Sequence, residues 1–537
     1  MTHSRLWSRG RVVPDADAVA VRGGEILATG RTPEMIALRG PETRVIDAGG
    51  ATVTPGLTDA HIHLLHWARA RTELDLHGST SREDVATRLT RFVSSRPGPG
   101  AVFGRGWDAN GWDRNPERAV LDAICPARPV LLYSRDFHNL WLNGTALAAA
   151  GITSATRDPQ GGMIVRDAAG EPTGLLKEHA MRLAAGLESV DADADYAATC
   201  DAVRALHANG ITAIHDFEGR DAHCILRRLA GGEGPRVRTL MHLPHAQLGI
   251  AIELGLSSGL GDAWFRMGAV KLFADGTLGS RTAAMLAPYE GTAETGIDVI
   301  DPAALRSEVR RAVDHGWSVA IHAIGDRAVR FSLDAFEGAR AGERLALAPR
   351  IEHAQLVDSR DLNRFAALGV AASMQPSHCI SDVPLAERWW GARREHSYPW
   401  RALVESGALL AFGSDAPVEP PSIALGLAAA VARQPEGALT AWVPGQAIGL
   451  DAALTAYTEG PARLAGNWPR SGALEPGCLA DLVVWNDDLH ALAPGALADA
   501  APACTVVDGM IVYESEDRAS GTGAPVSLAG RGAEGRS

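Results

Sequence analysis

Cysteine is scarce in this chain of 537 residues, and the few cysteines are scattered. No two of them form a CxxC pair; the six lie at positions 125, 200, 224, 379, 478 and 504. A disulfide framework and a zinc finger both need closely spaced thiols, so the sequence excludes these two classes. We expect free, mostly buried thiols and a cytoplasmic protein.

Long hydrophobic runs are also missing. The N-terminal residues contain no apolar core of signal-peptide length, which predicts a protein that is not secreted. The longest apolar stretches, such as IALGLAAAVA from Ile423, fall short of the roughly 18 residues that cross a bilayer. The sequence therefore predicts neither a membrane-spanning helix nor a membrane partner.

Positive charge is not in excess, because the formal net charge is −13. Proteins that bind nucleic acids or anionic membranes usually carry a basic patch, so we expect neither partner. The remaining composition, with 46% hydrophobic and 21% charged residues, is that of an ordinary globular protein. We expect a small-molecule substrate, and a homodimer is compatible with these properties.

What the sequence does contain is a series of short apolar runs that end in polar residues and alternate with helical patterns. There are eight, at residues 51–63, 210–217, 237–244, 268–276, 317–326, 349–356, 369–376 and 408–417. After the second run, most are spaced as βα units of about 30 residues or more would be. Continuous apolar strands are typical of a parallel sheet covered on both faces. The series predicts an α/β fold, a (β/α)8 TIM-type barrel over residues 54–465.

Two parts of the chain do not fit the barrel repeat. The interval between the first and second runs is far longer than one unit, which predicts an inserted lid subdomain at about residues 70–200 (the insertion). Alternating patterns around glycine turns at both ends predict one small β-sandwich built from residues 1–53 and 466–515. Residues 516–537 resemble a disordered tail in composition.

The stretch TPGLTDAHIHLLH (54–66) places two histidines, His61 and His63, two residues apart at the end of the first run. Residues i and i+2 of a strand point to the same face, so both imidazoles could hold one metal ion. Two chance histidines on an exposed strand would look the same. The remaining ligands decide between these interpretations.

Four further candidates lie at the ends of later runs: Lys271, His322, His353 and Asp415. If the barrel prediction is right, all these strand ends open onto one cavity. A lysine within an apolar strand is unusual, since an unpaired buried ammonium costs several kcal/mol. We therefore expect Lys271 to have a partner or to be modified, and the six residues to form a metal site.

Several ordered motifs resemble one known family. TPGLTDAHIHL, KLFADGTLGSRTA, HAIGDRA, RIEHAQL, MQPSHCISD and GSDAPVEPP are similar to motifs of the amidohydrolase superfamily, in the branch called amidohydrolase family 3 or YtcJ-like. That branch includes N-substituted formamide deformylase. The resemblance covers essentially the whole chain, including GEPTGLLKEHA within the insertion.

This resemblance implies a set of metal ligands on strands one, five, six and eight: His61, His63, His322, His353 and Asp415. In many relatives a lysine of strand four is carboxylated and bridges two metals, and Lys271 occupies that position. Imidazole and carboxylate ligands favour Zn²⁺, as one or two ions. Glu178 is a further acidic candidate in the insertion.

The expected reaction is hydrolysis of a C–N bond in an amide, formamide or cyclic amide. Zinc would lower the pKa of a bound water to about 7. Asp415 is the expected general base, which deprotonates that water and passes the proton to the leaving amine. The same activated water could attack a lactone or another ester. A non-catalytic scaffold is the third interpretation, but such proteins typically lose ligands, and here all six positions carry competent side chains.

Residues that could contact the substrate are less strongly indicated. Asp275 and Arg281 follow strand four, where a substrate contact and a structural role in the loop are equally well supported. His138 and Trp107 come from the insertion, although a tryptophan there more often packs in a core. His378 follows strand seven and could bind substrate or an oxyanion.

Overall fold

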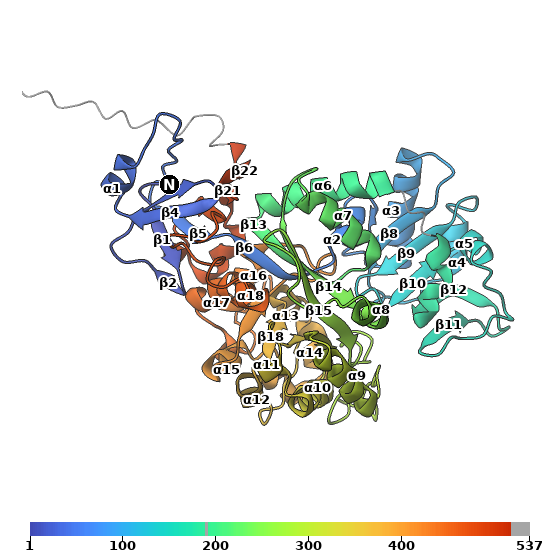
Figure 1. Cartoon of the computed structure of the whole chain (residues 1–537). Coiled ribbons are helices and arrows are strands. Elements are labelled where there is room, and N and C mark those ends of the chain that lie inside the picture. Colours follow the sequence, from blue (N-terminus) through green and yellow to red (C-terminus); the bar gives the residue numbers. More distant parts are fainter. Residues whose placement is uncertain (188–191, 517–537) are drawn as a thin grey trace, which may run out of the picture.

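The computed structural model describes residues 1–187 and 192–516 (Figure 1). Apart from Glu516, the predicted disordered tail lies outside the described residues. All six cysteines are free, and all except Cys224 are buried, as expected. Among the helices of the described ranges, none combines the length and apolar character needed to cross a membrane.

An eight-stranded parallel sheet forms the centre of the molecule and confirms the prediction of a TIM-like barrel. Each strand pairs in parallel with the next. In chain order the strands are β6 (Leu57–Ile62), β13 (Ile211–Asp216), β14 (Arg238–Pro244), β15 (Phe265–Phe273), β16 (Val319–Ala323), β17 (Arg350–His353), β18 (Ala371–Met374) and β19 (Leu410–Phe412). Each lies within or overlaps one of the eight apolar runs.

The last strand returns to the first and nearly closes the barrel. The backbone N–H of Asp415 donates to the carbonyl of His61 at 2.7 Å, and Ile62 bridges Ala416 in parallel. His63 N–H donates to the Ala416 carbonyl at 2.9 Å. Closure therefore brings the end of β6 beside the loop that follows β19.

Amphipathic helices cover the outside of the barrel and bury one large apolar core against it. Asp301 begins one of them by accepting hydrogen bonds from the N–H groups of Ala303 and Ala304, with Pro302 in the first turn. The helices are α6 (Ala192–Ala208), α7 (Arg220–Ala230), α8 (Leu248–Glu253), α9 (Pro302–Asp314), α10 (Asp326–Ala339), α12 (Leu362–Leu368), α15 (Trp400–Glu405), α16 (Ile423–Ala432), α17 (Leu450–Tyr457) and α18 (Glu459–Leu464). This cover explains why the strands read as continuous apolar runs.

The first apolar run, 51–63, is not one strand, contrary to expectation. It contains β5 (Thr52–Pro55), which belongs to another sheet, and β6 of the barrel. Gly56 lies between them, where an added Cβ would come within 2.3 Å of Thr212 Oγ1 and 2.8 Å of Asp481 Cβ. The chain passes so close to its neighbours at this point that a side chain cannot be accommodated.

Both ends of the chain contribute to that other sheet. Its order is β2 (Arg11–Val12), β1 (Arg5–Ser8), β5, β20 (Leu482–Trp485), β21 (Pro502–Val507) and β22 (Met510–Glu514). The hairpin of β3 (Ala18–Arg22) and β4 (Glu25–Gly30) packs with it around a shared apolar core. Figure 1 shows these first and last segments side by side, and we call this region the terminal sheet.

The insertion carries a separate six-stranded sheet between β6 and β13. Its order is β11 (Gly162–Arg166), β12 (Pro172–Glu178), β10 (Asn139–Leu142), β9 (Val130–Ser134), β8 (Val102–Trp107) and β7 (Leu74–Asp75). Two hydrophobic clusters involve this sheet, α3 (Arg82–Ser95) and α5 (Gly144–Ala149). In Figure 1 the insertion lies on the opposite side of the barrel from the terminal sheet.

A buried ion pair links the barrel to the terminal sheet and yields a stability prediction. Arg238 of β14 donates from Nη2 to Asp481 Oδ1 at 3.0 Å, and both residues are buried. Removing one partner of a buried pair leaves an uncompensated charge, which costs about 3–5 kcal/mol. We expect Arg238→Met to lower the free energy of unfolding by about 3 kcal/mol in denaturant titrations.

Arg204→Met is the matched control, because Arg204 pairs with Asp201 on the exposed surface at 2.6 Å. An exposed pair contributes at most about 1 kcal/mol. Equal losses in the two variants would mean that the Arg238 pair does not hold the terminal sheet to the barrel.

Candidate metal centre

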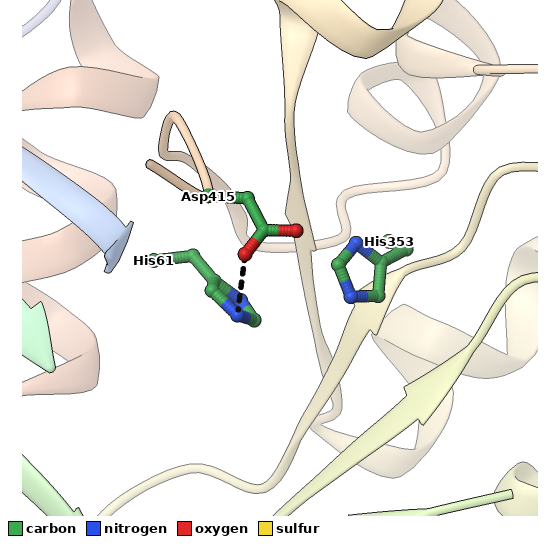
Figure 2. Close-up of side chains that lie close together, drawn as sticks. All are labelled: His61, His353 and Asp415. Carbon is green, nitrogen blue, oxygen red and sulfur yellow. Dashed lines mark ion pairs between the residues drawn. The ribbon is translucent and has the colours of Figure 1, made fainter. Parts of the chain in front are cut away.

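Three of the predicted ligands form a cluster at the carboxyl ends of the barrel strands. His61, His353 and Asp415 each offer one ligand atom, and these atoms all lie within 4.8 Å of one another. All three side chains are buried, and Figure 2 shows them directed into one space from three different strand ends. His61 Nε2 lies 3.5 Å from Asp415 Oδ1. This spacing is compatible with a single ion held between them.

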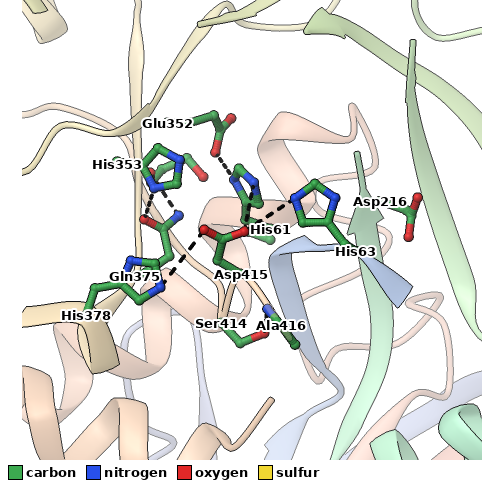
Figure 3. Close-up of polar contacts among 12 residues, drawn as sticks. His61, His63, Asp216, Glu352, His353, Gln375, His378, Ser414, Asp415 and Ala416 are labelled. Atoms are coloured by element: carbon green, nitrogen blue, oxygen red, sulfur yellow. Dashed lines mark hydrogen bonds and ion pairs between the residues drawn. The ribbon is translucent and has the colours of Figure 1, made fainter. Parts of the chain in front are cut away.

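Hydrogen bonds set which nitrogen of each imidazole faces the centre. His61 Nδ1 contacts Glu352 Oε2 at 2.6 Å, and His353 Nδ1 contacts Gln375 Oε1 at 2.7 Å (Figure 3). In both rings Nδ1 is the donor to an oxygen acceptor, so Nε2 carries the lone pair that a metal needs. The donor set and its orientation therefore fit a divalent ion bound by imidazole and carboxylate.

His63 and His322 lie next to this cluster. His63 Nε2 is 3.4 Å from Asp415 Oδ1, so both histidines of the HxH motif contact the same carboxylate. The His322 ring stands edge-on to that of His353, with centroids 4.5 Å apart. Its Nε2 donates to the carbonyl of Gly276 at 3.0 Å, which leaves Nδ1 to accept.

Backbone conformation at the strand ends directs these side chains. His353 has φ of 73°, Ala354 of 42° and Asp415 of 59°. Left-handed φ is uncommon for residues other than glycine and costs of the order of 1–3 kcal/mol, which the surrounding structure must offset. Two other residues singled out from the sequence, Glu178 and Arg281, also have positive φ, of 50° and 58°. Such residues concentrate at functional sites.

A buried charge pair below the centre, which sequence reasoning missed, orients His61. Glu352 is fully buried, forms an ion pair with Arg350 and accepts a hydrogen bond from His61 Nδ1. Burial raises the pKa of Glu352, but Arg350 and His61 lower it more. The pKa of this carboxyl therefore lies well below its ordinary value, and the group is ionised. Arg350 also donates to the Ala60 carbonyl at 2.7 Å and contacts His215 Nδ1 at 2.9 Å.

A signal for this pair was present in the motif RIEHAQL. Arg350 and Glu352 are two apart on a strand and therefore share its inward face. Two opposite charges inside an apolar strand indicate a buried pair, because charged side chains are almost never buried unpaired. Gln375, in MQPSH, gave no comparable signal, because a glutamine after a strand does not by itself indicate a buried contact or a functional role.

Lys271 is buried within the barrel wall. Its Nζ lies 4.6 Å from the ring centroid of Phe217 and 5.1 Å from that of Phe273. Burial lowers the pKa of Lys271 to about 8, with a further lowering by Arg350, against the opposing effect of Glu352 and Asp415. Cation–π contacts and nearby carboxylates therefore provide the partners that the sequence required.

Two residues predicted from the loop after β15 have structural contacts. The buried Asp275 carboxylate accepts hydrogen bonds from the backbone N–H groups of Ala284, Ile324 and Gly325, at 2.8–3.0 Å. Arg281 stacks over Trp389 at 4.9 Å and lies 3.6 Å from Glu294. These contacts favour the structural role in the loop over substrate contact.

The insertion supplies one buried tryptophan and one polar pair. Trp107 donates from Nε1 to the Leu132 carbonyl at 2.8 Å within the core of the insertion, which favours packing. His138 Nδ1 lies 2.9 Å from Glu178 Oε2. Burial lowers the pKa of His138, but Glu178, Asp136 and Asp415 raise it more, so the net shift is upward.

His378 faces the centre from α13 (Pro376–Ser381), the short helix that follows β18. Its Nε2 is 4.0 Å from Asp415 Oδ2 and has no hydrogen-bond partner within the described part of the chain. The side chain is buried. A buried ring nitrogen without a partner costs free energy unless something binds it, so this position suits a contact with a bound molecule.

The insertion is docked on the barrel rim close to these residues. Arg135, in the turn between β9 and β10, forms an ion pair with Glu419, which follows β19. Glu419 also accepts a hydrogen bond from Ser381 Oγ at 2.7 Å. The turn that carries His138 is therefore fixed to the rim by its neighbour Arg135.

Comparison with known proteins agrees with this geometry. The model of the amidohydrolase family matches residues 44–513. The chain is 33% identical to the putative amidohydrolase YtcJ of Bacillus subtilis, over 93% of this chain and 96% of that protein. It is 30% identical to N-substituted formamide deformylase of Arthrobacter pascens, over 93% and 95%. A solved structure of an uncharacterized metal-dependent hydrolase from Pyrococcus horikoshii is 27% identical, with a TM-score of 0.74 over 95% of this chain and 99% of that one.

The contact between Glu352 and His61 predicts that a variant without the carboxylate binds metal more weakly. Partners that hold a ligand histidine typically contribute 10- to 100-fold to metal affinity. We expect Glu352→Gln to raise the dissociation constant for zinc by about 10- to 100-fold in chelator competition.

Glu308→Gln is the control, because Glu308 makes the same kind of contact, at 2.9 Å, with His245 away from the centre. We expect no change of zinc affinity in this variant. Unchanged affinity in Glu352→Gln as well would show that His61 does not need the carboxylate to bind metal.

Proposed function

The chain belongs to the amidohydrolase family, and on that premise we propose that it is a metal-dependent hydrolase of a non-peptide C–N bond in a small amide, N-substituted formamide or cyclic amide. The observation that carries the proposal is the cluster of His61, His353 and Asp415, with ligand atoms within 4.8 Å of one another. Similarity to N-substituted formamide deformylase over most of both chains supports the choice of a C–N bond.

The proposed ion is Zn²⁺, because the donors are imidazole and carboxylate groups. His61, His353 and Asp415 would hold it, and His63 and His322 would complete the site from either side. When bound, such an ion supplies a water that loses its proton near neutral pH, and it polarises a carbonyl. Glu352 and Gln375 keep the two ligand rings in the orientation that this binding needs.

Asp415 is the proposed proton carrier. Burial raises its pKa, but His61, His63 and His353 lower it more, so it stays well below its ordinary value and is ionised. An ionised carboxylate at this position can accept a proton from the attacking water and deliver it to the leaving amine. His63 contacts Asp415 Oδ1, while Oδ2 faces His378, so the carboxylate is oriented from both sides.

His378 is proposed to bind the carbonyl oxygen of the substrate. Its unpartnered Nε2 faces the space beside Asp415, and a donor there would stabilise the oxygen as negative charge develops on it. The His138–Glu178 pair is proposed to bind a polar group of the substrate from the side of the insertion.

Lys271 is proposed as a ligand only in its carboxylated form, since an ammonium group has no lone pair to offer. A pKa of about 8 leaves a fraction of neutral amine at neutral pH, and only that form reacts with carbon dioxide. A carboxylated Lys271 would add an anionic oxygen next to the cluster and allow a second ion.

Removing the carboxylate of Asp415 tests the proposed reaction. We expect Asp415→Asn to lower kcat by about 10³-fold or more, because the proton carrier is lost while the fold is retained. The assay uses zinc-loaded protein and a panel of N-formyl amines, N-acyl amines, lactones and simple esters. Circular dichroism and thermal unfolding check the fold.

Asp451→Asn is the control, since Asp451 contacts His490 at 3.0 Å outside the barrel cavity, and we expect it to keep wild-type turnover. Full activity of Asp415→Asn, or of protein stripped of metal by a chelator, would overturn the proposal. If lactones or esters are hydrolysed and none of the amides is, the proposed substrate changes from an amide to an ester, with the same site.

A second prediction isolates His378. We expect His378→Leu to lower kcat by about 10²–10³-fold, the loss typical of one oxyanion donor, with unchanged zinc content. Elemental analysis and steady-state kinetics together provide the measurement. A rise of KM with constant kcat would mean that His378 binds the substrate and its transition state equally.

A further inference from the structure

Phe273 is a large apolar side chain that remains half exposed beside the metal centre. It is the last residue of β15, and its relative exposure is 50%, whereas Val270, Lys271 and Leu272 before it are buried. This exposure is found with the insertion docked on the barrel rim. An aromatic ring that stays half exposed beside the candidate metal ligands is a feature that needs an explanation.

The orientation of Phe273 follows from the strand. Lys271 and Phe273 are two apart on β15, so their side chains point to the same face, with Phe273 nearer the open end of the barrel. The Lys271 Nζ lies 5.1 Å from the ring centroid of Phe273. The ring also lies 5.3 Å from that of His322, tilted by 35°. Phe273 therefore lies directly next to Lys271 and His322, two of the proposed metal ligands.

Two further exposed apolar residues lie in the segment that runs beside the end of β15. The backbone N–H of Val299 donates to the carbonyl of Ala274, the residue after Phe273, at 2.9 Å. The relative exposures of Val299 and the nearby Ile297 are 46% and 48%. Substrate cavities are lined mostly by apolar side chains, with a few polar groups that orient the ligand. Here the polar groups are His378, His138 and the proposed ligands, and Phe273 is an exposed apolar side chain next to Lys271 and His322.

We propose that Phe273 binds an apolar substituent of the substrate, so that the preferred substrates carry an aryl or branched alkyl group next to the bond that is cleaved. This inference rests on the proposed function, because it places that bond at the metal centre. Burial of the open ring face by the substituent removes apolar surface of both partners from water. The alternative is that Phe273 serves only as a cation–π partner for Lys271.

Two pairs of substrates test the proposal with zinc-loaded enzyme. One pair varies the amine side, N-benzylformamide against N-methylformamide, and the other varies the acyl side, N-methylphenylacetamide against N-methylacetamide. The quantity compared is the ratio of kcat/KM for the large and small members of each pair. A general disturbance of the metal centre lowers kcat/KM for both members of a pair by the same factor and leaves this ratio unchanged.

We expect the wild-type ratio to favour the large member in at least one pair. Phe273→Ala should lower that ratio about 10- to 100-fold, whereas Phe273→Leu, which keeps an apolar side chain, should retain most of it. Met510→Ala is the matched control, since Met510 is an exposed apolar residue of the terminal sheet, and its ratio should equal that of the wild type.

A binding measurement keeps the inference separate from the reaction. Phenylacetohydroxamate and acetohydroxamate both bind zinc through the hydroxamate group and differ only in the phenyl ring. We expect the wild type to bind the phenyl compound at least about 10-fold more tightly, and Phe273→Ala to lose this preference. If no amide is hydrolysed but this preference is found in the wild type and lost in the variant, hydrolysis of a C–N bond is refuted, whereas binding of an apolar group by Phe273 beside the metal is supported.

Unchanged ratios in Phe273→Ala, for both substrates and hydroxamates, overturn the inference. Equal losses of kcat/KM for the large and small members also overturn the inference. They would mean that Phe273 acts through its cation–π contact with Lys271. Zinc content and thermal unfolding of each variant verify that the centre and the fold are intact.

Discussion

Closure of the barrel between its first and last strands is the constraint on which the metal centre depends. The N–H of Asp415 donates to the carbonyl of His61, and Ser414 hydrogen-bonds to Asp59 through both its N–H and its hydroxyl. These contacts bring a carboxylate from the end of β19 within 3.5 Å of an imidazole from β6. An open sheet of the same strands would leave the two groups on opposite edges, and no shared ion would be possible.

Residues inside the barrel then orient the ligand imidazoles of His61 and His353. Glu352, held ionised by Arg350, fixes the His61 ring through Nδ1, and Gln375 fixes that of His353 in the same way. Phe217 stacks on the His61 ring at 4.0 Å and on that of His242 at 4.0 Å. Polar pairing and ring stacking thus restrict the imidazoles to one arrangement in a closely packed core, as preorganised metal binding requires.

Elements outside the barrel strands lie beside the centre. The turn of the insertion that carries His138 is tied to the rim through Arg135 and Glu419, so the polar pair of His138 and Glu178 lies on one side of the rim. On another side, Phe273 presents an open aromatic surface. A metal-dependent hydrolase with these walls would select substrates by one polar and one apolar feature around the reacting bond. In the proposed function, the centre would set the chemistry and its surroundings the selectivity.

The sequence by itself determined the barrel strands and the candidate residues near their carboxyl ends. Apolar runs with His, Lys or Asp at or near their ends can be recognised without knowledge of the fold. It could not show that residues 51–63 divide at Gly56 between two sheets, since both strands are equally apolar. Only the tertiary structure decided that Asp275 binds backbone N–H groups, that Trp107 lies in the core of the insertion, and that Glu352 and Gln375 hold the imidazoles. Each of these roles depends on a partner distant along the chain, and pairwise distances exist only once the chain has folded.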